Sequence, residues 1–231
     1  MAKIGMIGGL GPESTVDYYK LIISAFKKEI SKENYPEIII YSMNMTNLLG
    51  LMAGNKLEEA ARWLAKGVNV LEGAGADFAF ISSNTPHAVF NIVRGLSNIP
   101  IISIVEETCK YIKKSGFTKV GLLGTKFTMQ SDFYQKVFDK ADIEIVLPTI
   151  DEQQYIHGKL MDEIEVGIIL DETKDGLLKI IKRMKDENSI QAVILGCTEL
   201  PLILRGDMYG IPFLNTSSIH VNSVIEYLKN I

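Results

Sequence analysis

Two short polar segments carry the side chains that could do acid–base chemistry. Cys197 follows the apolar run 192–195, and Ser83 follows the apolar run 79–81. A helix that begins just after a strand lowers the pKa of a thiol at its N-terminus, so we expect Cys197 to form a thiolate near neutral pH and act as a base. The Ser83 hydroxyl is equally well explained as a turn residue. His87, four residues after Ser83, could orient a group at this site or simply cap a helix.

The two polar segments belong to an internal repeat. Cys197 stands 114 residues after Ser83. Nearly the same displacement relates two further pairs of segments, 119–124 with 3–8 and 211–214 with 99–102. Three matches in the same order predict two copies of one unit. Each copy ends a strand in a polar turn, and one copy offers a thiol where the other offers a hydroxyl.

The elements that must position these turns follow from the hydrophobic pattern. Short β-branched runs alternate with helical patterns, which favours an α/β fold with parallel sheets. We predict four strands in each copy, at 3–8, 37–43, 77–83, 99–103, 119–124, 143–147, 190–196 and 211–214. Apolar residues at helical spacing predict helices at 57–71, 106–114, 173–187 and 219–228.

The C-terminal helix sets the expected domain boundaries. It is preceded by two serines that can cap it, and it would most simply return to pack on the first copy. We therefore place residues 1–103 and 217–231 in a first domain and residues 104–216 in a second. Ligands of open parallel sheets bind at the carboxyl ends of the strands, so we expect a site in the cleft between the two copies.

Helix-capping residues follow four of the predicted strands, in the turns 8–12, 84–86, 124–125 and 197–199. Helix N-termini offer unpaired N–H groups and a positive dipole end, so several at one sheet edge favour a small carboxylate ligand. Any one turn is equally well explained as an ordinary cap. We expect the substrate to be bound by Leu10, Gly11, Asn84, Thr85, Thr125, Lys126, Thr198 and Glu199.

Composition excludes several classes of protein. A net charge of −4 over 231 residues gives no basic field for nucleic acid or an anionic membrane. The two cysteines, Cys109 and Cys197, exclude a disulfide framework and suit a reducing cytoplasm. Cys109 fits a buried helix face and is expected to be inert. No apolar run approaches the roughly 18 residues that span a bilayer. We expect a cytoplasmic homodimer with a small-molecule substrate.

Two cofactor motifs fail on inspection. The segment 9–14 approximates a dinucleotide fingerprint, but its third glycine is absent and the second strand ends without the acidic residue that would hold a ribose. A metal site needs clustered ligands, and only Cys197 and Glu199 are close in sequence. We therefore expect neither a metal nor an organic cofactor.

Taken together, the polar turns resemble the aspartate/glutamate racemase family. The matching segments are 8–15, 83–87, 124–129 and 196–201. The resemblance covers nearly the whole chain, and Gly-Cys-Thr-Glu-Leu-Pro at 196–201 is its most specific part. It implies two flavodoxin-like α/β domains related by a pseudo-twofold axis, with the active site between them. It also implies racemisation of an amino acid without pyridoxal phosphate, in which one group removes the α-proton and another returns a proton to the opposite face.

The sequence departs from the usual family pattern at three places. Ser83 stands where most members have a second cysteine, and the chain resembles a subset of the family that carries a hydroxyl residue there and retains the other cysteine. The resemblance implies that Cys197 acts on the L-substrate while Ser83 returns the proton. Aspartate racemases carry an arginine after the second strand, but residues 44–55 contain no arginine or lysine. Glu165 occupies the expected position of a family lysine. Aspartate or glutamate is the implied substrate, and the last two departures remove positive charge that would hold its side chain.

Two other function classes stay open. A single-cysteine isomerase or decarboxylase of diacids would need Cys197 but no opposite-face partner. A small-carboxylate-binding protein would keep the turns and lose the chemistry. Exchange of an α-proton with solvent separates a racemase from a binding protein, and the identity of the product formed from an achiral diacid separates a racemase from the diacid enzymes.

Overall fold

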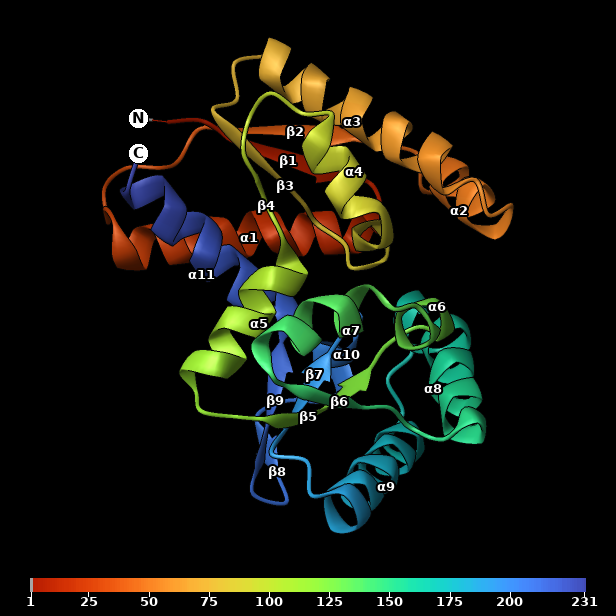
Figure 1. Ribbon diagram of the computed structural model, residues 1–231. Helices are drawn as coiled ribbons and strands as arrows, with labels where there is room; N and C mark the ends of the chain where they lie inside the picture. The colour runs from red at the N-terminus through yellow and green to blue at the C-terminus, as the bar shows by residue number, and fades with distance from the viewer. Residues whose placement is uncertain (1) are drawn as a thin grey trace. The chain divides into compact units, whose positions relative to one another are not determined.

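The computed structural model describes residues 2–231, and its chain divides into two compact units (Figure 1). Unit 1 comprises the chain up to Glu107 together with Ser217–Ile231, and unit 2 comprises Thr108–Thr216. Each unit is built on its own parallel sheet. Within the described residues, no helix is both long enough and apolar enough to span a membrane.

The sheet of unit 1 contains four parallel strands in the order β2-β1-β3-β4. The strands are β1 (Ile4–Gly8), β2 (Ile38–Ser42), β3 (Phe78–Ile81) and β4 (Ile101–Ile102). Every residue of β1 and β3 is buried, as expected for central parallel strands that are covered on both faces. The continuous apolar runs in the sequence therefore mark the centre of the sheet.

Helices cover both faces of this sheet. Helix α1 (Pro12–Glu29) and helix α11 (Thr216–Lys229) share one apolar cluster with β1 and β3, and Figure 1 shows them together on one side. The remaining helices are α2 (Met45–Ala53), α3 (Leu57–Gly73), η1 (Thr85–Val89) and α4 (Phe90–Gly95). Helix α3 buries the apolar stripe that the sequence predicted. The expected packing of the C-terminal helix on the first copy is observed, since α11 belongs to unit 1 from Ser217 onward.

The sheet of unit 2 repeats this strand order and adds one strand, giving β6-β5-β7-β9-β8. The strands are β5 (Lys119–Leu123), β6 (Glu144–Val146), β7 (Ala192–Leu195), β8 (Asp207–Met208) and β9 (Ile211–Asn215). The prediction of two four-stranded parallel sheets is confirmed, except that β8 was not predicted. It pairs antiparallel with β9 through Tyr209 and Gly210, whose φ values of 58° and 75° are those of a tight hairpin turn.

Eight further helical segments lie between Ile104 and Ile203, and the first of them begins in unit 1 and continues into unit 2. They are α5 (Ile104–Lys114), α6 (Lys126–Gln130), α7 (Phe133–Phe138), η2 (Asp139–Ala141), α8 (Ile150–Asp162), η3 (Ile164–Val166), α9 (Asp171–Asn188) and α10 (Leu200–Ile203). Helix α8 begins at a capping box formed by Thr149 and Glu152. Helices α8 and α9 pack on β7 in one apolar cluster, and that cluster includes Cys197.

The repeat extends to the packing of the central strands. A side chain at Gly5 of β1 would lie 3.0 Å from Ala76, the second residue before β3. A side chain at Gly121 of β5 would likewise lie 3.0 Å from Ile190, the second residue before β7. In both units, a glycine on the first strand therefore lets the residues just before the neighbouring strand pack closely against it. This contact holds β3 and β7, and hence the turns that follow them, in place.

A buried histidine links three elements of unit 1. The Tyr18 hydroxyl of α1 donates to Nδ1 of His220 in α11 at 3.0 Å, and Nε2–H of His220 donates to the Ile102 carbonyl of β4 at 3.1 Å. The carbonyl can only accept, so this pair of bonds defines the tautomer. Burial, together with the nearby His87, lowers the pKa of His220 to about 3. The imidazole is therefore neutral in the folded protein.

We expect this histidine to make unit 1 sensitive to mild acid. The unfolded-state pKa of histidine is about 6.5, so below that pH the unfolded chain binds a proton that folded His220 refuses. The free energy of unfolding should fall on acidification, with His220 contributing about 2 kcal/mol of the loss at pH 5. Thermal or urea unfolding near pH 7.5 and near pH 5 measures this contribution in wild type and His220→Gln.

The comparison of wild type with His220→Gln isolates the contribution of His220, because the other titrating groups contribute equally to both proteins. His220→Gln loses the Tyr18 bond at every pH, so its overall stability is expected to be lower. Its loss of stability between the two pH values should nevertheless be smaller than that of wild type. Equal losses in the two proteins would show that folded His220 takes up a proton like an exposed histidine.

Candidate active site

Cys197 lies directly after β7, at the carboxyl end of a strand whose four residues are all buried. The preceding Gly196 donates its N–H to the Leu123 carbonyl of β5 at 2.7 Å. A side chain at Gly196 would lie 2.9 Å from that same carbonyl, so the turn requires glycine there. The thiol is consequently held against the end of β5, and the residue is only 7% exposed.

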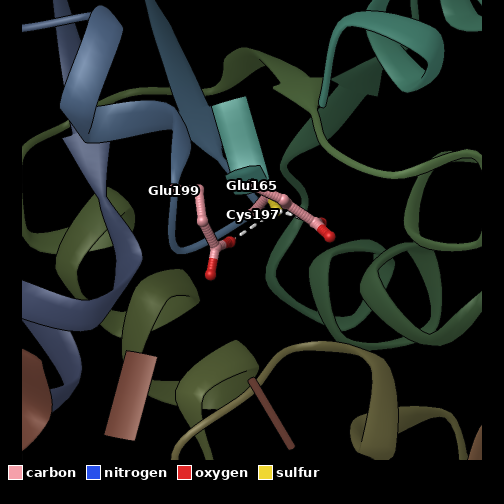
Figure 2. Close-up of side chains that lie close together, drawn as sticks. All are labelled: Glu165, Cys197 and Glu199. Atoms are coloured by element: carbon pink, nitrogen blue, oxygen red, sulfur yellow. Dashed lines mark hydrogen bonds between the residues drawn. The ribbon is translucent and has the colours of Figure 1, made fainter. Parts of the chain in front are cut away.

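Two carboxylates flank the thiol (Figure 2). Sγ of Cys197 donates to Oε2 of Glu199 at 2.9 Å, and Oε1 of Glu165 lies 3.9 Å from the same sulfur. The Thr198 hydroxyl also donates to Oε2 of Glu199, at 2.8 Å. Glu165 comes from η3, 32 residues before the cysteine. We call Glu165, Cys197 and Glu199 the thiol–carboxylate cluster.

The pKa of the Cys197 thiol is raised well above its ordinary value. Burial is the largest cause, followed by the charge and hydrogen bond of Glu199 and the charge of Glu165. The expectation that a helix N-terminus would lower this pKa is therefore wrong. Helix α10 has only four residues, and its N-terminus does not offset burial beside two carboxylates. In the absence of a ligand, Cys197 rests as a thiol and is a proton donor.

Glu165 exchanges protons near neutral pH. Its side chain as a whole is exposed, yet desolvation of its carboxyl group and the charge of Glu199 raise its pKa to about 7. The hydrogen bond from Cys197 acts in the opposite direction. Within residues 2–231, no lysine, arginine or histidine forms an ion pair with Glu165 or Glu199. The cluster thus combines three acid–base groups with no protein cation to balance them.

The three donor atoms of the cluster lie within 4.8 Å of one another, close enough to contact one metal ion. One sulfur and two carboxylate oxygens could contact an ion, but no histidine joins them among the described residues. A bound metal would also hold the sulfur as a ligand and remove it from proton transfer. The expected absence of a metal and of an organic cofactor stays a prediction.

The other predicted site residues of unit 2 lie at the same sheet edge. Thr125 follows β5 and caps α6 by accepting from the Thr128 N–H at 3.3 Å, and exposed Lys126 is the first residue of that helix. The turns after β5 and β7 are in contact, since a side chain at Gly124 would lie 3.3 Å from the Gly196 backbone. Thr198 and Glu199 therefore share one edge with Thr125 and Lys126. Their role in binding a substrate stays a prediction.

The predicted site residues of unit 1 gather at the carboxyl ends of β1 and β3. Leu10 and Gly11 lie between β1 and α1, and Gly11 adopts a φ of 122° that favours glycine. Ser83, Asn84 and Thr85 follow β3, where Ser83 is half-buried and Asn84 is buried. Because β1 and β3 are neighbours, both turns lie at one edge of the sheet.

The expected capping chemistry is found at only one of the four turns. The side chain of Thr125 caps its helix, whereas the N-terminal residues of α1, η1 and α10 make no side-chain cap. Gly11 has no side chain to offer, and the helices that follow Asn84 and Glu199 are a short 3-10 helix and a single α-helical turn. Helix dipoles at these two turns are therefore weaker than the sequence suggested.

His87 holds the main chain of Ser83 and does not contact its hydroxyl. Nε2 of His87 accepts from the Ile104 N–H at 3.2 Å, so Nδ1–H must donate to the Ser83 carbonyl at 3.0 Å. The ring stacks on Phe90 at 4.7 Å, and burial lowers its pKa to about 3. With both nitrogens engaged, His87 orients Ser83 through the backbone and cannot serve as its base.

We expect His87→Leu to destabilise unit 1. The substitution leaves the Ser83 carbonyl and the Ile104 N–H without the partner that they have in the wild type. Losing these two hydrogen bonds is expected to cost about 2 to 4 kcal/mol together. Ser83→Ala is the matched control, because the Ser83 hydroxyl makes no hydrogen bond within the described structure. Urea unfolding should show a change below about 0.5 kcal/mol for that control. A similar effect of both substitutions would contradict the positioning role.

Comparison with known proteins gives matches over almost the whole chain. The sequence profile of a family described as Asp/Glu/hydantoin racemase matches residues 7–224. The broad specificity amino-acid racemase RacX of Bacillus subtilis (strain 168) is 27% identical over 226 residues, which are 96% of each chain. A glutamate racemase of a Hydrogenobaculum species is 28% identical over 188 residues, covering 77% of this chain and 67% of its own.

The fold is similar to a solved structure as well. The crystal structure of an aspartate racemase homologue from Pyrococcus horikoshii OT3 superposes with a TM-score of 0.89 and is 36% identical. The match covers 99% of this chain and all of the other. Sequence and fold thus agree over both units.

Proposed function

The chain belongs to the Asp/Glu/hydantoin racemase family, and from this membership we propose that it interconverts the L- and D-forms of an amino acid without an organic cofactor. Family membership supports an amino acid racemase. One observation carries the proposal to particular residues. It is the hydrogen bond of 2.9 Å from the buried Cys197 thiol to the Glu199 carboxylate, at the carboxyl end of a central parallel strand.

Racemisation requires one group to remove the α-proton and another to return a proton on the opposite face. Because Cys197 rests as a thiol, its proton must leave first, and Glu199 accepts its hydrogen bond. The S–H bond breaks and an O–H bond forms on Glu199. The thiolate then takes the α-proton of the L-substrate, and the electron pair left on the α-carbon is delocalised into the substrate carboxylate.

We assign the return of the proton to Ser83. Its hydroxyl donates a proton to the opposite face of the α-carbon and regains one from a water molecule. The hydroxide that is left takes the proton that Glu199 accepted from Cys197, which restores both groups. His87 is excluded as a helper because both of its ring nitrogens are engaged. A hydroxyl with no base beside it removes a proton poorly, so the L-enantiomer is the preferred starting substrate.

Aspartate and glutamate are the substrates that the family description suggests, and Lys126 is the cation among the proposed binding residues. The alternative diacid isomerase or decarboxylase is disfavoured by a thiol flanked by two carboxylates with no paired cation. A pure binding protein would have no use for the acid–base couple of Cys197 and Glu199. We also propose a cytoplasmic homodimer that binds neither nucleic acid nor membranes.

We expect Cys197→Ser to slow α-proton exchange by about a thousandfold or more, because it removes the proposed base. Loss of the α-proton signal of L-amino acids in D₂O, followed by NMR, measures this rate. Cys109→Ser is the control, since Cys109 lies on α5 within the apolar interior. The assignment fails if the two variants exchange at similar rates.

The proposed asymmetry between the two faces predicts a difference in initial rates. Wild type should exchange the α-proton of the L-enantiomer about tenfold faster or more than that of the D-enantiomer, because Ser83 provides no thiolate. Ser83→Cys should raise the D-rate and change the L-rate less. Initial deuterium incorporation into each enantiomer tests both statements. Equal L- and D-rates in wild type would mean that another base acts on the face assigned to Ser83.

A further inference from the structure

The two glutamates of the thiol–carboxylate cluster have no basic partner in the part of the chain that the structure describes, whereas two other glutamates of unit 2 do. Glu163 of unit 2 pairs with Lys159, and Glu152 pairs with Arg183 at 2.6 Å. Glu165 and Glu199 have no such partner within residues 2–231, although both lie against a buried sulfur. Two carboxyl groups that lie against one buried sulfur without a cation are an unfavourable arrangement, which a positively charged ligand would relieve.

An amino acid carries the group that would supply this missing charge. Its α-ammonium has three donors and one positive charge, which suit two carboxylate oxygens. The three cluster atoms lie within 4.8 Å of one another, so a cation bound by the carboxylates is also close to the sulfur. A positive charge at this distance favours the charged form of the thiol.

We propose that Glu165 and Glu199 bind the ammonium group of the substrate, and that its arrival converts the Cys197 thiol to the thiolate. The identity of the ligand as an amino acid rests on the proposed function. The proton crosses the 2.9 Å hydrogen bond from Sγ to Glu199, breaking the S–H bond and forming an O–H bond. Ionised Glu165 supplies the charge that pairs with the ammonium, and protonated Glu199 accepts a hydrogen bond from it with the other oxygen. The base is thus generated only when a substrate is present.

The same charges define the preferred substrate class. An amino acid with a second carboxylate brings another negative charge towards a cluster that has no cation of its own. A neutral side chain avoids this repulsion, and a side chain with a second ammonium adds attraction. We therefore infer that neutral or cationic amino acids are better substrates than aspartate or glutamate.

The thiolate can be measured directly by its ultraviolet absorbance. Titrations use the Cys109→Ser protein, with the Cys109→Ser/Cys197→Ser protein as the blank. L-alanine should raise the thiolate fraction about tenfold at a fixed pH, equivalent to a thiol pKa lowered by about one. Succinate, a dicarboxylate without an ammonium group, should leave the fraction unchanged or lower it. An equal rise with both ligands, or a rise with neither, overturns the proposal.

Variants of the cluster test the role of each carboxylate without any ligand. Glu165→Gln and Glu199→Gln should each lower the thiol pKa, because each removes a negative charge beside the sulfur. Each should also weaken the response to L-alanine. Glu144→Gln is the matched control, since Glu144 pairs with Lys119 at the amino ends of β6 and β5, away from Cys197. The proposal is contradicted if the thiol of both cluster variants titrates as it does in wild type.

The substrate panel separates this inference from the proposed function. Exchange of the α-proton in D₂O is compared for L-alanine, L-lysine and L-aspartate in wild type and Glu165→Gln. We expect L-aspartate to be slowest in wild type and to gain about tenfold relative to L-alanine in the variant. No exchange with any amino acid, combined with the expected thiolate response, refutes the racemase and leaves the ammonium site intact. If wild type exchanges L-aspartate fastest and the ratio of L-aspartate to L-alanine exchange is unchanged in Glu165→Gln, only the inferred substrate class is refuted.

Discussion

The close packing of each central pair of parallel strands is the constraint on which the site residues depend. In unit 2, Leu123 of β5 pairs with Leu195 of β7, and the Gly196 N–H continues the ladder by one further bond to the Leu123 carbonyl. The turn that carries Cys197 is thereby an extension of the sheet rather than a free loop. A thiol on so rigid a support loses little conformational entropy when it meets a reacting atom.

Burial and the neighbouring negative charges both raise the pKa of the Cys197 thiol, so the thiol form is favoured while nothing is bound. The apolar cluster of α8, α9 and β7 keeps water from the sulfur, and the two carboxylates add negative charge beside it. Ionisation of this thiol cannot depend on a strong helix dipole, because α10 is one turn long. Its ionisation must instead come from what binds. The protein therefore avoids keeping a reactive thiolate exposed to oxidants or electrophiles while no substrate is present.

The sequence predicted what local patterns determine and missed what tertiary contacts determine. Apolar runs such as 192–195 marked the central strands, and glycine-rich turns marked their ends. The two-residue strand β8 carries no alternating pattern, and it forms because Tyr209 and Gly210 turn it back on β9. In the sequence, Glu165 stands out only as a substitution for a family lysine, because no local pattern places it beside a cysteine 32 residues away. The direction of the thiol pKa was misjudged because it follows from burial and neighbours that only the folded chain defines.

The discontinuity of unit 1 has a consequence for biosynthesis. Tyr18 and His220 are hydrogen-bonded across 202 residues of sequence, and the apolar cluster of β1, β3 and α1 is closed by Val221, Val224 and Leu228 of α11. A ribosome releases these residues only after the continuous segment of unit 2 has been made. Of the two units, unit 1 thus begins to emerge before unit 2 and completes its core after it, and its apolar face stays exposed until α11 emerges. Chaperone binding to the nascent chain should therefore be concentrated on the N-terminal segment rather than on the middle of the chain.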